Sequence, residues 1–170
     1  MNILKIKTEK RQLGDYGEAV ARRYLRRHGY RIVKRNFVAD SHEIDIIATN
    51  RDFLVFVEVK TRTVGKENPN EPRPASSVTA EKQRSIISAA RFYTAYNPCN
   101  KKKRFDVIEV YVSSNNNRYY VAEVKHLQNA FNLNTAFSPM ERLKNEVHQY
   151  QRRRSDWGLR STRNKNRTRK

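Results

Sequence analysis

The sequence predicts an α/β domain built around one mixed β-sheet. Apolar residues recur at helical spacing in two segments, and five other segments have the short apolar patterns of strands. These segments follow one another in the order helix, three strands, helix, two strands, which is typical of a mixed sheet flanked by helices. The length of 170 residues suits one such domain followed by a tail.

The first helix is expected over residues 13–28. Its apolar side chains recur every three or four residues, at Leu13, Tyr16, Val20 and Tyr24. Gly29 follows and can adopt the left-handed conformation that ends a helix. Residues 1–11 are rich in Lys and Arg, and we expect them to form a mobile basic lead-in.

Three strands are expected next, over residues 30–35, 43–49 and 53–61. The polar residues 50–52 predict a tight turn between the second and third strands. The third strand begins apolar on both of its faces, which is typical of a central, buried strand.

The second half of the chain predicts a helix and two more strands. Residues 62–77 contain three prolines and are expected to form a loop. Thr79 can cap a helix over residues 80–96. Strands are expected over residues 104–112 and 119–125.

The chain is expected to have three parts: the lead-in of residues 1–11, a domain over residues 12–131, and a basic segment over residues 132–170. That last segment is expected to hold a helix over residues 139–153 and then a disordered tail. The chain carries 36 Lys and Arg against 17 Asp and Glu, for a net charge of +19. The last twenty residues hold nine Lys or Arg and one Asp, so the rest of the chain is strongly basic too.

Composition excludes several classes of protein. The longest strictly apolar run is residues 53–57, far too short to cross a bilayer, and no apolar stretch of a secretory signal follows the basic start. A single cysteine, Cys99, leaves no disulfide within the chain and no cysteine-based metal site. We therefore expect a cytoplasmic protein without membrane attachment. Its high positive charge predicts a polyanionic partner.

The third predicted strand carries two charges where apolar residues are expected. Side chains alternate between the faces of a strand, so Glu58 and Lys60 follow Leu54 and Phe56 on one face. The other face holds only valines in this stretch. Charges at the end of an otherwise apolar face are either an exposed ion-pair ladder or a functional site.

The second predicted strand has the same feature, because Glu43 and Asp45 share a face with an isoleucine. A two-residue hairpin loop would place Asp45 opposite Glu58 and Glu43 opposite Lys60, with paired Cβ atoms about 4.5–5.5 Å apart. Neighbouring carboxylates repel one another, and Mg²⁺ relieves that repulsion because it prefers oxygen ligands. The local pattern leaves a surface ladder and a metal site equally open. An acidic patch in so basic a protein favours the metal site, with the basic remainder holding a nucleic-acid backbone.

A wider set of motifs resembles the YraN family of bacterial endonuclease-like proteins. Asp45, followed after twelve residues by Glu58-Val59-Lys60, resembles the catalytic signature of the PD-(D/E)XK, or restriction-endonuclease-like, superfamily. The more specific strings lie at residues 14–21, 36, 43–47, 56–62, 78–83, 104–107 and 129–131. Together they cover about residues 12–131. The resemblance implies a restriction-endonuclease-like core in the order αβββαββ, similar to archaeal Holliday junction resolvases.

The resemblance also implies roles for individual residues. Asp45 and Glu58 would be metal ligands, with Mg²⁺ or Mn²⁺ as the cofactor, and Lys60 would lie beside the attacking water. Glu18 matches an additional glutamate of resolvase-like members, and Glu43 would assist the metal or pair with Lys60. The expected nucleic-acid contacts are Arg62, Lys82, Gln83, Lys101, Lys102 and Lys103. One departure is His42, which stands where the family pattern has a glycine.

The sequence thus predicts a metal-dependent endonuclease-like protein that hydrolyses DNA phosphodiester bonds, in DNA repair or recombination. The alternative is a non-catalytic nucleic-acid-binding protein on a nuclease-like fold. A basic RNA- or ribosome-associated protein would account for the tail but not for the carboxylates. The resemblance to resolvases that cut paired strands suggests a homodimer.

Overall fold

The computed structural model describes residues 3–64, 78–115 and 118–137, with the side chains of residues 3–7 left out. It divides into a unit of residues 1–132 and a unit of residues 133–170. The first unit contains α1 (Ile3–Arg27), β1 (Arg31–Ala39), β2 (His42–Thr49), β3 (Phe53–Thr63), α2 (Ala80–Tyr96), β4 (Lys102–Asn115) and β5 (Arg118–Phe131). The described part of the second unit holds the short helix α3 (Leu133–Ala136). The predicted α/β class and the order αβββαββ are confirmed, and they are consistent with a restriction-endonuclease-like core.

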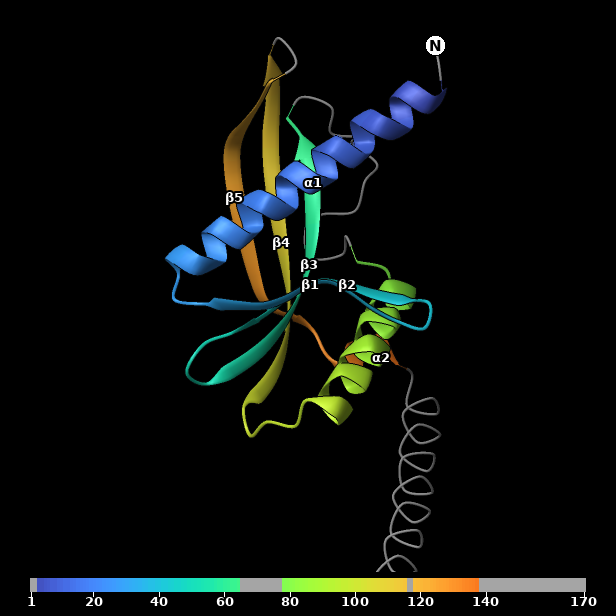
Figure 1. Ribbon diagram of the computed structural model, residues 1–170, viewed down its shortest axis with the longest axis vertical. Helices are drawn as coiled ribbons and strands as arrows, with labels where there is room; N and C mark the ends of the chain where they lie inside the picture. The colour runs from blue at the N-terminus through green and yellow to red at the C-terminus, as the bar shows by residue number, and fades with distance from the viewer. Residues whose placement is uncertain (1–2, 65–77, 116–117, 138–170) are drawn as a thin grey trace, which may run out of the picture. The chain divides into compact units, whose positions relative to one another are not determined.

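The five strands form one mixed sheet in the order β1-β2-β3-β4-β5. The chain runs antiparallel from β1 to β2 and from β2 to β3, and antiparallel again from β4 to β5. Only β3 and β4 are parallel, and α2 lies between them in the chain (Figure 1). A parallel pair needs a crossover connection, so this position of α2 follows from the strand directions. The third strand is central, as its two apolar faces predict.

The two long helices pack on opposite faces of the sheet. Val55 and Val57 of β3 belong to the core that includes Ala21 and Leu25 of α1. Phe56 points the other way, where its ring meets Tyr93 of α2 at a centroid distance of 6.2 Å. The alternation along β3 therefore separates the two halves of the core.

The first helix approaches the sheet closely at a glycine. A Cβ atom built on Gly17 would lie 1.8 Å from Oγ1 of Thr61 in β3, so no larger residue fits without movement. A Cβ atom on Gly14 would meet nothing within 4 Å. The close approach of this helix therefore depends on Gly17 and not on Gly14.

Several elements are longer than expected. The first helix begins at Ile3 and not at Leu13, so most of the expected lead-in is helical. Residues 3–12 lack Gly and Pro and contain good helix formers, which lets the helix extend toward the N-terminus. The last two strands also run several residues beyond their predicted ends. Predicted helix 80–96 is confirmed, with Oγ1 of Thr79 accepting a hydrogen bond from the backbone of Lys82.

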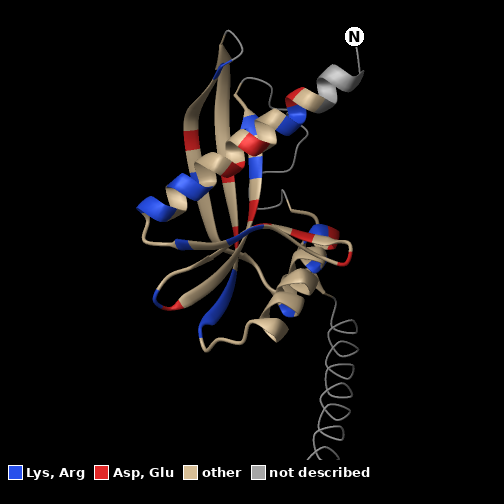
Figure 2. Cartoon of the chain, viewed as in Figure 1, with Lys and Arg blue, Asp and Glu red and all other residues tan. Residues whose placement is uncertain are grey.

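Other predictions fall outside the described residues. Most of the predicted loop, residues 65–77, and the predicted helix and tail beyond residue 137 lie there. The charged residues that are described are spread over α1, α2 and the sheet, and no single element holds them all (Figure 2). In the described ranges, no helix combines the length and apolar character that crossing a membrane requires.

Candidate active site

The site lies where β2 and β3 separate. The two strands pair from Ile46 opposite Val57 to Thr49 opposite Leu54, which is the register that the predicted hairpin requires. Beyond Val57, β3 continues to Thr63 beside β4 alone. The ladder thus ends one step before the predicted pairing of Asp45 with Glu58.

The side chain of Asp45 fills the opening between the strands. Its Oδ2 atom accepts a hydrogen bond of 2.6 Å from the backbone N–H of Val59. This bond satisfies a donor on β3 that the departing β2 backbone no longer reaches. Asp45 therefore remains beside Glu58 although the two residues are not ladder partners.

The protonation of Asp45 reflects its crowded position. Burial and the charge of Glu58 together raise the pKa of Asp45 to about 7, against the opposing effects of the Val59 hydrogen bond and Lys82. The charge of Glu18 raises this pKa slightly further. A carboxyl group that holds its proton near neutral pH can exchange that proton for a cation.

Glu58 is a buried carboxylate between two lysines. The residue is 3% exposed, and its Oε1 atom lies 2.8 Å from Nζ of Lys60. Its Oε2 atom lies 3.2 Å from Nζ of Lys82 but has no partner with hydrogen-bond geometry. Lys60 lies on the same strand two residues away, whereas Lys82 comes from the first turn of α2. The buried charge is therefore balanced, but one oxygen retains unused capacity to accept a bond.

The two carboxyl groups suit a cation that prefers oxygen ligands, such as Mg²⁺ or Mn²⁺. Among the described residues, no three or more His, Cys, Asp or Glu side chains lie together in a way that could hold a metal ion. Mg²⁺ commonly keeps several waters and takes only one or two carboxylates from the protein. Asp45 and the unsatisfied oxygen of Glu58 match that donor set.

The other predicted carboxylates lie near the site but do not join it directly. Glu18 of α1 forms an ion pair of 3.7 Å with Arg22, and its charge acts on Asp45. Burial raises the pKa of Glu18 against the effect of Arg22, and the charges of Asp15 and Glu43 raise it further. Glu43 is exposed on β2. The alternative expectation that Glu43 pairs with Lys60 is wrong, because β2 has left β3 by that point and Lys60 pairs with Glu58.

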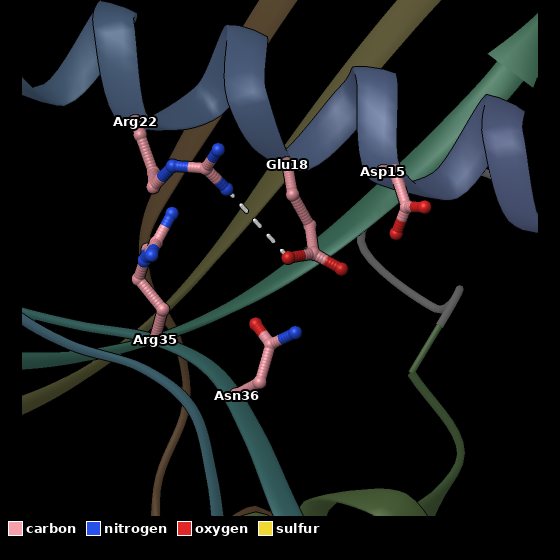
Figure 3. A pocket seen from close by; sticks show the side chains of 5 residues that line it. All are labelled: Asp15, Glu18, Arg22, Arg35 and Asn36. Carbon is pink, nitrogen blue, oxygen red and sulfur yellow. Dashed lines mark ion pairs between the residues drawn. The ribbon is translucent and has the colours of Figure 1, made fainter.

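A pocket of about 360 Å³ lies between α1 and β1 (Figure 3). Its lining residues are Asp15, Glu18, Arg22, Arg35 and Asn36. Glu18 is a predicted site residue, whereas Arg22 and Arg35 are not among the predicted ones. Arg22 lies one helical turn after Glu18, a spacing at which side chains meet, and this signal could have been used. Arg35 gave no such signal, because its proximity to Arg22 depends on how α1 crosses β1.

The predicted nucleic-acid contacts divide into two groups. Lys82 contacts Glu58, and Nε of Arg62 lies 3.7 Å from Oε1 of Glu109 on β4, in the strand region beyond the β2–β3 separation. Gln83 follows Lys82 in α2, and its Nε2 atom donates to the carbonyl of Val78 at 2.9 Å.

The second group lies beside the N-terminal end of β3. It consists of Lys102 and Lys103, which begin β4, and Lys101, which precedes them. Lys102 pairs with Phe53, whereas Glu58 pairs with Val107, so about 17 Å of strand separates them from the site. Nζ of Lys101 donates to the carbonyl of Asn50, and Nζ of Lys103 donates to that of Cys99 at 3.2 Å. The structure therefore does not bring these three lysines to the site.

His42 and Asp106 have local roles. Nδ1 of His42 lies 3.1 Å from Oγ of Ser85, so the residue that departs from the family pattern connects β2 to α2. Asp106 is fully buried and bonded to Arg104, His126 and the backbone of Asn129. Burial favours a raised pKa for Asp106, but these hydrogen bonds outweigh it and lower the pKa.

Comparison with known proteins places this geometry in a family. A model described as "Uncharacterised protein family UPF0102" matches residues 17–110, which include Asp45, Glu58, Lys60 and the second helix. A UPF0102 protein of Caldanaerobacter subterraneus is 39% identical over 126 residues, covering 74% of this chain and 98% of the relative. A UPF0102 protein of Chlorobaculum parvum is 44% identical over 126 residues, covering 70% of this chain and 91% of the relative. The chain belongs to the uncharacterised protein family UPF0102, the YraN family that its motifs resemble.

Proposed function

We propose that the protein is a Mg²⁺- or Mn²⁺-dependent nuclease that hydrolyses phosphodiester bonds of DNA. The proposal depends chiefly on one observation. The separation of β2 from β3 leaves Asp45 and Glu58 side by side in a partly buried site, with the Lys60 amine on Glu58. Two carboxyl groups and a lysine in this arrangement supply ligands for a cation and a positive charge that can orient the attacking water and the phosphate.

Each residue has a distinct role in this proposal. Asp45 and Glu58 would hold the cation, which stabilises negative charge on the phosphoryl oxygens. Asp45 would lose its proton on cation binding, because the proton and the cation compete for the same carboxylate oxygens. Lys60, paired as a cation with Glu58, would orient the attacking water, and the proton of that water would pass to solvent. The water oxygen then bonds to phosphorus as the bond to the leaving oxygen breaks.

The strong positive charge supports DNA as the substrate. Phosphate contacts by basic residues are independent of sequence, so the shape of the DNA would determine any preference. Arg62 and Lys82 lie close enough to the site to contact phosphates near the cleaved bond. A cytoplasmic place of action and a homodimer that cuts paired strands belong to the same proposal.

A cleavage assay tests the nuclease proposal. Linear, branched and single-stranded DNA are incubated with the wild-type protein and Mg²⁺ or Mn²⁺, beside Glu58→Gln and Lys60→Ala. Glu58→Gln keeps the size of the side chain but removes its charge. We expect cleavage by the wild type and a loss of at least about a hundredfold in both variants, since each removes a group that acts in the reaction.

The same assay separates catalysis from binding alone. Wild type and variants that are equally inactive on every substrate, while all bind DNA, would contradict the nuclease proposal. That result would favour the non-catalytic alternative. A specific observation agrees with that alternative, because Lys60 and Lys82 already balance the charge of Glu58 without a metal.

A further inference from the structure

The pocket between α1 and β1 has a cationic part that the proposed chemistry does not use. Arg22 projects from α1 and Arg35 from β1, and their guanidinium groups approach one another across the pocket (Figure 3). The side chain of Arg22 is only 17% exposed. Asn36 lines the pocket beneath them. Two cations and an amide therefore converge on one hollow.

The two arginines lie close enough to repel each other, although the charges of Glu18 and Asp15 partly offset that of Arg22. Burial lowers the pKa of Arg22, and the charge of Arg35 lowers it further, which shows that the two cations oppose each other. The carboxylate of Glu18 lies 3.7 Å from one nitrogen of Arg22, longer than a direct hydrogen bond. Within the described part of the chain, Arg35 has no carboxylate at ion-pair distance. An anion placed between the guanidinium groups would relieve their repulsion.

The pocket adjoins the candidate active site through Asn36. The β1–β2 ladder pairs Arg35 with Ile46 and Phe37 with Ile44, so Asn36 lies across from Asp45. Directly opposite residues of neighbouring strands have Cα atoms about 4.5–5.5 Å apart. Asn36 has φ of 46°, a left-handed conformation that asparagine tolerates better than most residues. This conformation interrupts the strand and allows its amide to line the pocket on the α1 side.

The acidic residues of the pocket lie toward the other carboxylates. Glu18 is electrostatically coupled to Glu43 and Asp45, and Arg35 reaches into the same hollow from β1, below Arg22 (Figure 3). Glu18 is thus the pocket carboxylate whose charge acts on Asp45, while Arg22 and Arg35 bring the positive charge of the pocket. A nucleic-acid strand with one phosphate at the metal site would place a neighbouring backbone phosphate at the arginines.

We propose that Arg22, Arg35 and Asn36 form a subsite for a backbone phosphate of the nucleic acid, next to the phosphate that is cleaved. This inference rests on the proposed function and adds the way in which the substrate strand is held. A guanidinium group donates two parallel hydrogen bonds to phosphate oxygens, and the asparagine amide adds a neutral donor. The subsite positions the strand across the site, whereas Asp45, Glu58 and Lys60 carry the reaction.

The experiment measures DNA binding without a metal, so its outcome does not depend on cleavage. Fluorescence anisotropy gives the Kd of a fluorescein-labelled 20-base-pair duplex in EDTA over a series of NaCl concentrations. Each phosphate contact that is lost reduces the slope of log Kd against log salt by about 0.9. We expect this reduction in Arg35→Gln and in Arg22→Gln, with Kd raised roughly fivefold to tenfold at 0.1 M salt.

Two further variants make the test specific. Arg35→Lys keeps the charge and is expected to restore most of the slope. Arg51→Gln removes the same charge in the exposed turn after β2, about 20 Å along the strand from Asp45, and is expected to keep the wild-type slope. Arg35 is itself exposed, so its replacement leaves the fold intact, and a thermal melt checks this for Arg22→Gln.

The outcomes distinguish the subsite from the nuclease. Wild-type slopes in both Arg22→Gln and Arg35→Gln, or equal losses in these variants and Arg51→Gln, would overturn the subsite. If those slopes fall but the wild type never cleaves, the subsite stands and the nuclease proposal fails. If the wild type cleaves DNA but the slopes of the two arginine variants do not change, the nuclease proposal stands and the subsite fails.

Discussion

At the scale of single residues, the site holds two carboxyl groups close together in a partly buried place, where burial and mutual repulsion both disfavour a second negative charge. Asp45 and Glu58 are held beside each other by a backbone hydrogen bond and two lysines, and Asp45 meets the cost by holding a proton up to about pH 7. Such unfavourable local electrostatics are typical of functional sites, because a purely structural position would not retain them. The arrangement should therefore have measurable consequences for stability and for metal binding.

Asp45→Asn should stabilise the protein in EDTA. The pKa of Asp45 is about 7 in the folded protein and 3.8 for an ordinary aspartate, so the folded state binds more protons between these values. Stability contributed by the protonated group is therefore lost as the pH rises from about 4 to 7. The asparagine does not ionise, so at pH 8 we expect a gain in free energy of unfolding on the order of 2 kcal/mol.

Urea unfolding at pH 8 and at pH 3.5 measures this effect. The advantage of Asp45→Asn should disappear at pH 3.5, where the wild-type carboxyl is protonated in both states. Asp52→Asn, in the exposed turn after β2, is the control and should change little at either pH. A less stable Asp45→Asn at pH 8 would show that the folded site favours the charged carboxylate.

Metal binding should release a proton. With a pKa of about 7, Asp45 is mostly protonated at pH 6.5, so Mg²⁺ that binds there must displace about three-quarters of a proton. Calorimetric titration with MgCl₂ in two buffers of different ionisation enthalpy measures this number. We expect it to fall toward zero at pH 9 and the binding itself to be lost in Glu58→Gln. Binding without proton release at pH 6.5 would place the ion elsewhere.

At the scale of elements, the position of α1 and the separation of β2 from β3 create the site. The helix brings Glu18 and Arg22 over the sheet because Gly17 lets it lie against Thr61. The ladder ends at the pair of Ile46 with Val57, and the space between the strands beyond it accepts the Asp45 side chain. Both contacts join residues that are distant in the sequence. The first would be lost if Gly17 gained a Cβ atom, and the second depends on Oδ2 of Asp45.

Gly17→Ala should destabilise the protein and disturb the site. The added Cβ atom would lie 1.8 Å from Oγ1 of Thr61, so the helix or the strand must move. We expect a loss of about 1–3 kcal/mol in urea unfolding, the usual range for overpacking, and weaker DNA binding as Arg22 shifts. Gly14→Ala is the matched control on the same helix. It meets no atom within 4 Å and should stabilise the helix by up to about 1 kcal/mol.

At the scale of the whole molecule, a buried polar network joins distant parts of the sheet. Asp106 of β4 bonds to Arg104, to His126 of β5 and to the backbone of Asn129, and Arg104 reaches the hydroxyl of Tyr30 before β1 at 2.7 Å. The network lies outside the candidate site. It holds the sheet together at one place by charges that are almost entirely buried.

Asp106→Asn should destabilise the whole domain cooperatively. The substitution leaves Arg104 buried without its carboxylate, and breaking a buried pair costs about 3–5 kcal/mol. Because the pKa of Asp106 is lowered, its stabilising effect is present at neutral pH and is lost as the pH falls through that lowered value. Thermal melts at pH 7 and 3 test this, with the exposed Glu123→Gln as control. A loss at pH 7 no larger than that of the control would contradict the role of the network.

Much of the fold could be predicted from the sequence because its signals are local. Alternating valines and aromatic residues predict a central β3, and Thr79 predicts where α2 begins. The register of the β2–β3 hairpin followed from its short turn, and the shared face of Glu58 and Lys60 from strand alternation. These features depend on backbone geometry over a few residues. Any sequence with the same order of apolar, polar and capping residues would have the same geometry.

The tertiary structure alone decided where the strands separate and what meets across the gap. No local pattern shows that the ladder ends at Ile46, that Lys82 reaches Glu58 from another element, or that Lys101 to Lys103 lie far from the site. The meeting of Arg22 with Arg35 likewise depends on the angle at which α1 crosses β1. Residue types and spacings therefore determined the elements and the chemical groups available. The packing of elements distant in sequence determined which groups act together, because electrostatic coupling depends on distance in space and on burial.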